Sequence, residues 1–380
     1  MNTAERLHSV QEYYFSKKLR EVKALLAEGK PIINMGIGSP DLAPPPSAME
    51  ALKGTLYQEG AHQYQSYQGL PELREAMAHF YKDRFGVIVN PTKELLPLIG
   101  SKEGIMHISL AFLNPGDGVL IPDPGYPTYG SVSRLIGAKA ITYGLKAEND
   151  WLPDLKELEQ HDLSQVKLMW ISYPNMPTGA KITMQGMKSL LTFAQKHDIL
   201  LVNDNPYSFV LNDSPTSILQ LEGAKAYALE LNSLSKTFNL AGWRVGMVLG
   251  SAEHIQAVLK VKSNMDSGMF MGIQKGAIEA LKSGPTWYQE LDAVYTKRRT
   301  LMFQLVDKLG CTYDRDTAGM FVWAKLPEGA ESSEDFIDQL LHDKHIFIAP
   351  GTIFGANGAG YIRFSLCVPC EQITTAMARL

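Results

Sequence analysis

Short hydrophobic runs alternate with helical patterns along the first three quarters of the chain. The runs end in polar or glycine-containing turns, and they cover residues 94–101, 166–174, 199–207, 226–235 and 244–251. Helical patterns are found at 102–113 and 183–197. Hydrophobic runs without strict alternation are typical of strands buried on both faces, and their interleaving with helices indicates a mostly parallel sheet. The pattern therefore predicts an α/β fold in which ligands bind beyond the carboxyl ends of the strands.

A different pattern begins after about residue 283. Helical stretches cover 285–310 and 332–345, and strand-like runs cover 318–327, 346–351 and 360–368. This order indicates a smaller α+β unit. No low-complexity linker separates it from the first unit, and the sequence shows no internal repeats. We predict an N-terminal segment at 1–45 that joins the small domain, a large domain at 46–282 and a small C-terminal domain at 283–380.

The composition excludes several classes of protein. A chain of 380 residues with 45% hydrophobic content can bury a large core. The net charge of -4 gives no basic footprint for nucleic acid. The charged N-terminus lacks the apolar region of a signal peptide, and no apolar run approaches membrane-spanning length. We therefore expect a soluble, cytoplasmic protein without nucleic-acid or membrane partners.

The three cysteines are Cys311, Cys367 and Cys370, an odd and sparse set that favours a reducing compartment over a disulfide scaffold. Cys367 and Cys370 form a lone CxxC. Because no second pair or adjacent histidine accompanies them, we interpret the spacing as chance packing and predict no metal site.

The segment SLSKTFNLAGWRVG, residues 233–246, carries the most specific chemistry. It places Lys236 beside the hydroxyls of Ser233 and Ser235 and sets Arg244 eight positions later. A lysine amine can form a Schiff base with a carbonyl cofactor, while short hydroxyl donors and a planar guanidinium suit a phosphate dianion. Taken as a bare pattern, the lysine and the arginine would be two solvated charges.

This spacing resembles the cofactor-lysine motif of the fold-type I, class I/II aminotransferases, with Gly242 where that family has a glycine. The resemblance implies an aspartate aminotransferase-like fold and the cofactor pyridoxal 5'-phosphate, attached to Lys236. It also implies transamination between an L-amino acid and a 2-oxo acid by a ping-pong mechanism, in which the freed Lys236 amine carries a proton.

The end of a buried run supplies a carboxylate and a tyrosine at Asp204 and Tyr207. Asp204 would hold the cofactor's pyridine nitrogen protonated, and Tyr207 would donate to its phenolic oxygen. An aspartate at a strand end is more often a helix cap. The distance from Asp204 to Lys236, 236 − 204 = 32 residues, resembles that in the family and favours the cofactor role.

Gly100, Ser101 and Lys102 lie where a strand is predicted to turn into a helix, so backbone amides can receive the phosphate. A simple helix cap by Ser101 is the alternative. Tyr126, in PDPGYPTY, resembles the residue that stacks on the cofactor ring, although an aromatic residue in such a loop also serves packing.

The substrate's α-carboxylate needs a partner, and YIRFSLC resembles the C-terminal arginine motif of the family. We assign Arg363 as a bidentate clamp, assisted by the backbone around Ile37 and Gly38. An edge-strand arginine that reaches solvent is the alternative. The GIGSP sequence around Gly38 is no dinucleotide fingerprint, because it lacks the third glycine and the following helix.

The resemblance extends over nearly the whole chain and is strongest to the LL-diaminopimelate aminotransferase branch, as in HQYQSYQGLPELREAM and KSNMDSGMFMGIQKGAIEAL. Tyr64 matches the family tyrosine that reaches the phosphate of the neighbouring subunit, which implies a homodimer with shared active sites. Substrate choice does not follow, because a few side-chain contacts decide it.

One departure concerns the turn that the family writes PNNPTG. This chain has Asn175 followed by Met176, so the usual asparagine donor to the phenolic oxygen is replaced by a thioether, which cannot donate. Either Tyr207 serves that oxygen alone, or Asn175 shifts register to replace the donor. Pro174 and Pro177 restrict the turn and favour the first alternative.

Two other functions stay open at this stage. A β-lyase on the same fold would keep every cofactor residue and differ only in the substrate pocket. A catalytically inactive binding protein of this fold is disfavoured by the joint presence of Lys236, Asp204 and Arg363.

Overall fold

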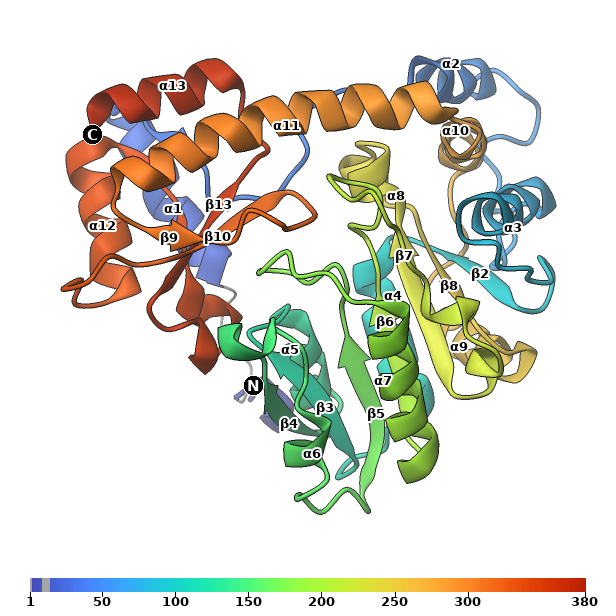
Figure 1. Ribbon diagram of the computed structural model, residues 1–380. Helices are drawn as coiled ribbons and strands as arrows, with labels where there is room; N and C mark the ends of the chain where they lie inside the picture. Colours follow the sequence, from blue (N-terminus) through green and yellow to red (C-terminus); the bar gives the residue numbers. More distant parts are fainter. Residues whose placement is uncertain (1, 9–13) are drawn as a thin grey trace.

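The computed structural model describes residues 2–8 and 14–380, and a seven-stranded sheet forms the centre of the larger unit (Figure 1). Its strand order is β2-β8-β7-β6-β5-β3-β4. Strand β8 runs antiparallel to both neighbours, and β7, β6, β5, β3 and β4 pair in parallel. The strands are β2 (Leu95–Leu98), β3 (Gly118–Asp123), β4 (Lys139–Gly144), β5 (Val166–Ile171), β6 (Leu200–Asp204), β7 (Ala228–Ser233) and β8 (Gly246–Leu249). The expected α/β class with a mostly parallel sheet is confirmed.

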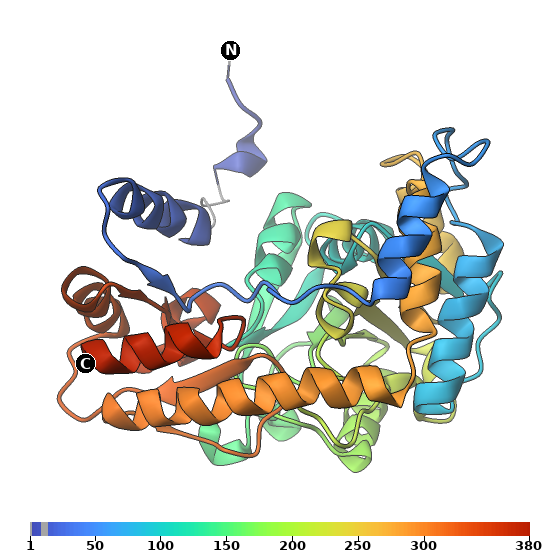
Figure 2. The same ribbon diagram turned by 90° about the horizontal axis from the view of Figure 1, so that it is seen from above.

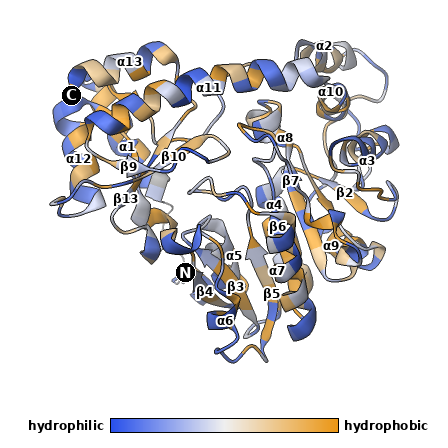
Figure 3. Cartoon of the chain, in the orientation of Figure 1, coloured by the Kyte–Doolittle hydropathy of each residue, from blue (hydrophilic) through white to orange (hydrophobic). Residues whose placement is uncertain are grey.

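Helices cover both faces of this sheet, which explains why its strands are continuous hydrophobic runs. On β5, Leu168 and Trp170 pack with α4, α5 and α9, whereas Met169 and Ile171 pack on the other face with α3, α7 and α10. Every residue of β2, β7 and β8 is buried. Figure 3 shows hydrophobic colouring on the inner strands and hydrophilic colouring on the outer side of α7.

The helices have the following bounds. They are α1 (Tyr14–Ala27), α2 (Pro46–Thr55), α3 (Pro71–Phe85), α4 (Ser101–Phe112), α5 (Thr128–Leu135), α6 (Leu155–Leu158), α7 (Met184–His197), α8 (Leu234–Thr237), α9 (Ala252–Lys262), α10 (Met271–Leu281), α11 (Pro285–Lys308), α12 (Ser333–Lys344) and α13 (Cys370–Arg379). None of the described helices combines the length and apolar character needed to cross a membrane.

The smaller unit contains an antiparallel sheet of order β12-β13-β10-β9 and a parallel pair, β1 with β11. The strands are β1 (Ile33–Asn34), β9 (Thr312–Tyr313), β10 (Phe321–Lys325), β11 (Ile346–Phe347), β12 (Ala349–Pro350) and β13 (Tyr361–Ser365). One hydrophobic cluster joins Val22, Ile33 and Met35 to residues of the C-terminal quarter. The N-terminal segment therefore packs with the smaller unit.

Helix α11 connects the two units. It begins with Pro285 at its first position, where the missing N–H costs no hydrogen bond, and it runs along both units from α10 towards α13 (Figures 1 and 2). The predicted boundary at residue 282 falls between α10 and α11, and the domain limits stay a prediction.

Candidate active site

A cavity of about 640 Å³ lies where the carboxyl ends of β6 and β7 face the N-terminal segment and β13. It collects most of the residues singled out in the sequence. The lining includes Ile37, Gly38, Ser101, Lys102, Tyr126, Asp204, Tyr207, Ser233, Ser235, Lys236, Arg244 and Arg363. Residues from positions 37 to 363 thus meet in one place, as expected at the carboxyl edge of a parallel sheet.

Lys236 lies on the short helix α8, directly after β7. Ser233 caps this helix through a hydrogen bond from the Ser235 N–H to its Oγ, 3.1 Å long. The Lys236 Nζ donates to the carbonyl oxygen of Gly38 at 2.7 Å. Burial lowers the pKa of Lys236 to about 8, and the nearby guanidinium groups of Arg363 and Arg244 act in the same direction. An amine with such a pKa is neutral often enough near neutral pH to act as a nucleophile or base.

A group of anion-binding donors lies at one end of the cavity. Gly100 precedes α4 with φ +85°, a left-handed conformation that favours glycine, and a Cβ there would lie 2.3 Å from the Arg244 guanidinium. Arg244 therefore lies directly over the start of α4, at Ser101. The Ser233 and Ser235 hydroxyls are 2.9 Å apart beside it. Hydroxyls, a guanidinium and a helix N-terminus suit a phosphate.

Asp204 is the last residue of β6, and its side chain is buried. Tyr129 donates to its Oδ2 at 2.7 Å, while Oδ1 has no hydrogen-bond partner among the described residues. Burial raises the pKa of Asp204 to about 7. A buried carboxylate with one unsatisfied oxygen needs a cationic N–H donor, and a protonated pyridine nitrogen is such a donor.

Tyr207 and Tyr126 contribute aromatic surface to the same cavity. The Tyr207 ring packs edge-to-face on Phe321 with centroids 5.7 Å apart, and burial raises the pKa of its hydroxyl, so it stays a donor. Tyr126 packs edge-to-face on Tyr129 at 5.7 Å. Contacts with neighbouring aromatic rings therefore help to fix the orientation of both tyrosine rings.

Arg363 projects from β13, and only 4% of it is exposed. One of its terminal nitrogens donates to the Gly36 carbonyl oxygen at 2.7 Å, and the other lies 3.4 Å from the Met176 sulfur. Its guanidinium carbon lies 4.0 Å from the ring centre of Phe321 and 4.6 Å from that of Phe354. Cation–π contacts hold a guanidinium in one plane, which preorganises it for a planar carboxylate. The alternative of a solvent-exposed edge arginine is excluded.

The turn at Asn175 and Met176 places these two side chains differently. Asn175 Oδ1 accepts from the Thr178 hydroxyl at 2.8 Å, and the Asn175 backbone is bonded to Gly179 and Ala180. Met176, in contrast, lines the cavity. Asn175 is thus not among the residues that line the cavity, which favours the alternative in which Tyr207 serves the phenolic oxygen alone. The cofactor role of Asn175 stays a prediction.

Tyr64 also lies away from the cavity. It is 91% exposed and borders a separate hollow with Gln65, Gly268 and Phe270. Its role toward a second subunit stays a prediction.

Cys367 and Cys370 are free thiols in the structure.

Sequence reasoning missed two features that support the site. Tyr129 orients Asp204 and stacks on Trp170 with centroids 5.0 Å apart. Arg298 of α11 binds both carboxylate oxygens of Asp41 at 2.6 and 2.7 Å, which ties down the segment after Gly38. The only sequence signal for Tyr129 was its place three residues after Tyr126.

The donor set fits pyridoxal 5'-phosphate. The unsatisfied Asp204 Oδ1 matches a pyridinium N–H, the donors around Arg244 match a phosphate, and Lys236 lies in the same cavity. The cavity volume is in the range of small-cofactor sites.

Comparison with known proteins agrees with this chemistry. The chain matches the family model "Aminotransferase class I and II" over residues 30–380. It is 40% identical over 382 residues to an LL-diaminopimelate aminotransferase of Dehalococcoides mccartyi, covering 100% of this chain and 98% of the relative. Substrate-bound BacF from Bacillus subtilis superposes with a TM-score of 0.95 at 36% identity, covering 100% and 97% of the two chains. An aspartate aminotransferase mutant of Thermus thermophilus has a TM-score of 0.93 at 25% identity, covering 100% and 98%.

Proposed function

Because the chain belongs to the class I and II aminotransferases, enzymes that transfer nitrogenous groups, we propose that it catalyses pyridoxal 5'-phosphate-dependent transamination between an L-amino acid and a 2-oxo acid. The mechanism is ping-pong. One observation carries the proposal: Lys236, Asp204 and Arg363 line the same cavity. Asp204 has one carboxylate oxygen without a hydrogen-bond partner among the described residues, and Arg363 packs against the ring of Phe321.

Each end of the cavity has its own task in cofactor binding. Arg244, Ser101, Lys102, Ser233 and Ser235 would hold the phosphate. Asp204 would hold the ring nitrogen, Tyr207 would donate to the phenolic oxygen, and Tyr126 would cover the ring face. When bound, the cofactor supplies a carbonyl carbon for amine attachment and an electron sink for the pair left at the substrate's Cα.

Lys236 acts as the proton carrier in this scheme. Its amine would take up the proton that leaves the substrate Cα and would hold it for the return transfer. The lowered pKa of about 8 keeps a useful fraction of the amine neutral for the first transfer. The nearby carbonyl oxygen of Gly38 orients the Nζ and accepts a hydrogen bond from it.

Arg363 positions the amino acid for this transfer. Its guanidinium would bind the α-carboxylate with two parallel hydrogen bonds, and Phe321 and Phe354 hold its plane in one orientation and shield it from water. The backbone at Ile37 and Gly38 forms the adjacent wall. A Cβ at Gly38 would lie 2.3 Å from the Phe321 ring, so a glycine is required for this close approach.

The cavity walls outside the cofactor-binding residues are largely apolar and include Leu19, Ile37, Met176 and Phe354. Such walls would contact the hydrocarbon part of a long side chain, while a charged group at the far end of that side chain would lie towards water or the lining residues Ser16 and Ser39. We propose LL-diaminopimelate, the substrate in the names of the relatives, or a related long-chain amino acid as donor.

Half-reaction spectra test this function. The cofactor-loaded enzyme is mixed with single amino acids, and conversion to the pyridoxamine form is followed by visible absorbance; a 2-oxo acid should then restore the original spectrum. We expect LL-diaminopimelate, methionine, leucine and phenylalanine to react faster than aspartate, alanine and glycine. Release of ammonia and pyruvate from cysteine-type substrates would instead support the β-lyase alternative, and no spectral change with any amino acid would support an inactive binding protein.

We further propose a cytoplasmic homodimer with shared active sites. Support comes from the exposed aromatic residues Tyr57 and Tyr64, 92% and 91% accessible, on the connection between α2 and α3. Isolated apolar residues on a surface are common, but two strongly exposed aromatic rings on one loop suit a subunit interface.

A further inference from the structure

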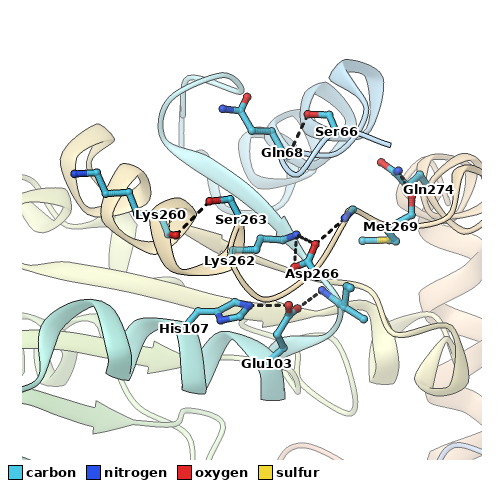
Figure 4. A network of polar contacts seen from close by, with 12 residues as sticks. Ser66, Gln68, Glu103, His107, Lys260, Lys262, Ser263, Asp266, Met269 and Gln274 are labelled. Carbon is cyan, nitrogen blue, oxygen red and sulfur yellow. Dashed lines mark hydrogen bonds and ion pairs between the residues drawn. The ribbon is translucent and has the colours of Figure 1, made fainter. Parts of the chain in front are cut away.

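A polar network of four side chains lies beside the start of α4, outside the cavity (Figure 4). Glu103 and His107 project from α4, whereas Lys262 ends α9 and Asp266 follows it. His107 and Lys262 are 2% exposed at their side chains, Asp266 12% and Glu103 19%. Charged side chains this far from water need partners, so the contacts within the network are informative.

Glu103 is bonded in two directions. Its Oε2 accepts the backbone N–H of Ile99 at 2.5 Å, and its Oε1 lies 2.7 Å from His107 Nε2. Ile99 directly precedes Gly100, so this contact fixes the turn from β2 into α4. Ser101 and Lys102, which line the cavity, follow immediately. The direction in which the first N–H groups of α4 point therefore depends on Glu103.

A second carboxylate, Asp266, lies beside this arrangement together with its own cation, Lys262. Side-chain ligand atoms of Glu103, His107 and Asp266 lie within 4.8 Å of one another. Lys262 Nζ donates to both oxygens of Asp266 at 2.8 Å. Two neighbouring carboxylates repel unless a positive charge lies beside them, and the buried ammonium supplies that charge. A metal ion would compete with Lys262 for Asp266, so we assign the network a positioning role and no metal.

The network also reaches the loop that carries Tyr64. Asp266 Oδ1 accepts the N–H of Gly268 at 2.8 Å, and the Gly268 backbone lies against the carbonyl of Gln65. Gln274 Oε1 accepts the N–H of Leu70 at 2.7 Å, at the far end of the same loop. Movement of Asp266 would thus disturb this loop, and Asp266 also lies next to Glu103.

We propose that Glu103 is a positioning residue for the phosphate of the cofactor: bonded to His107 and with the Lys262–Asp266 pair beside it, it fixes residues 99–102 in the anion-binding conformation. This inference rests on the proposed function, since it assumes a phosphate-bearing cofactor in the cavity. Glu103 does not touch that cavity itself, because it is absent from the lining residues that the structure describes.

The test compares pyridoxal 5'-phosphate with pyridoxal, which lacks the phosphate. Dissociation constants of both are measured by absorbance on cofactor-free protein for the wild type, Glu103→Ala, Glu103→Asp and Glu103→Gln. Alanine removes the bond to Ile99 and aspartate is too short to reach it, so both should weaken phosphate-ester binding on the order of tenfold. Pyridoxal binding should change less than about twofold, and Glu103→Gln, which keeps an acceptor oxygen, should stay near the wild type.

Glu94→Ala is the matched control. Glu94 also accepts a backbone N–H, from Asn90 at 2.8 Å, and pairs with a lysine, Lys225 at 2.8 Å, but it lies outside the cavity. It should leave both constants unchanged. Equal weakening of both ligands by Glu103→Ala or Glu103→Asp would show a general structural role and overturn the proposal, as would no change in either. A wild type that binds neither ligand would instead refute the proposed function.

Discussion

Asp204 is a residue whose burial serves the chemistry of the site and lowers the stability of the cofactor-free protein above acidic pH. Its carboxyl is buried with one unsatisfied oxygen, and its pKa is raised from 3.8 to about 7. The folded, cofactor-free protein therefore binds this proton more tightly than the unfolded chain does. By linkage, the free energy of unfolding of the cofactor-free protein falls as the pH rises from about 4 to 7. Over this range the carboxyl is already ionised in the unfolded chain but still binds its proton in the folded protein.

The first prediction follows from this linkage. Asp204→Asn keeps the acceptor for Tyr129 but carries no charge. The cofactor-free variant should therefore melt at a higher temperature than the wild type at about pH 7 to 8. The difference should grow between about pH 4 and 7 and level off above that. Thermal unfolding of both proteins across this range checks it. A variant less stable than the wild type at the upper pH would contradict a raised pKa.

Arg363 gives a second prediction at this scale. Arg363→Lys should lower the turnover of every amino acid by roughly one to two powers of ten, because a point charge cannot form two planar hydrogen bonds. Cofactor affinity should stay nearly unchanged. Steady-state kinetics and cofactor titration check it, with the exposed Arg315→Lys as control. A variant that loses the cofactor but keeps its affinity for substrate would show that Arg363 does not bind the α-carboxylate.

Residues that the sequence singled out in short motifs, such as Lys236 with Arg244, meet in the cavity, and their roles stay predictions. Contacts between distant segments were not predictable. Tyr129 and Asp204 lie 75 positions apart, and no local pattern marks their hydrogen bond. The tie of Glu103 to Ile99 is local, but its link to Asp266 depends on how α9 packs beside α4.

Among the elements, hydrophobic runs predicted five strands of the large sheet, including the edge strand β2, and missed the inner strand β3 and the edge strand β4. Strand β4 is half-exposed at the sheet edge, so it lacks a continuous apolar run and was missed. The run 346–351 was predicted as one strand but splits into β11 and β12, which pair in different sheets. Hydrophobicity indicates burial, but strand pairing is decided by tertiary contacts.

The turn from Pro174 to Gly179 carries the third prediction. An asparagine at position 176 would donate to the ionised phenolic oxygen of the cofactor and stabilise its deprotonated state. Met176→Asn should therefore lower the pH midpoint of the visible absorption of the loaded enzyme, with activity retained. Spectrophotometric titration measures this shift. An unmoved midpoint would mean that Asn175 or Tyr207 already serves that oxygen.

At the scale of the whole molecule, exposed apolar side chains gather near the loop that follows α2. Leu56, Tyr57, Tyr64 and Tyr67 are all exposed on it, and Met265, in the segment packed against this loop, is 60% exposed. The reading of Tyr64 as a contributor to the neighbouring site requires this surface to be covered by a second chain.

The fourth prediction is that the enzyme stays dimeric on dilution through its working concentration. Tyr64→Phe should weaken cofactor affinity without dissociating the dimer, since it removes a hydroxyl and keeps the ring. Sedimentation velocity and cofactor titration check the two halves of this statement. A fully active monomer would remove Tyr64 from the cofactor site.

Lys236 is central to the proposed function as the residue that would carry the cofactor. The purified protein, loaded with pyridoxal 5'-phosphate, should show visible absorbance that borohydride abolishes by fixing the cofactor covalently. Peptide mapping by mass spectrometry should then find the label on the peptide containing Lys236, and Lys236→Ala should take up no label there. A label on another lysine, or a protein that gains no visible absorbance from added cofactor, would contradict the account.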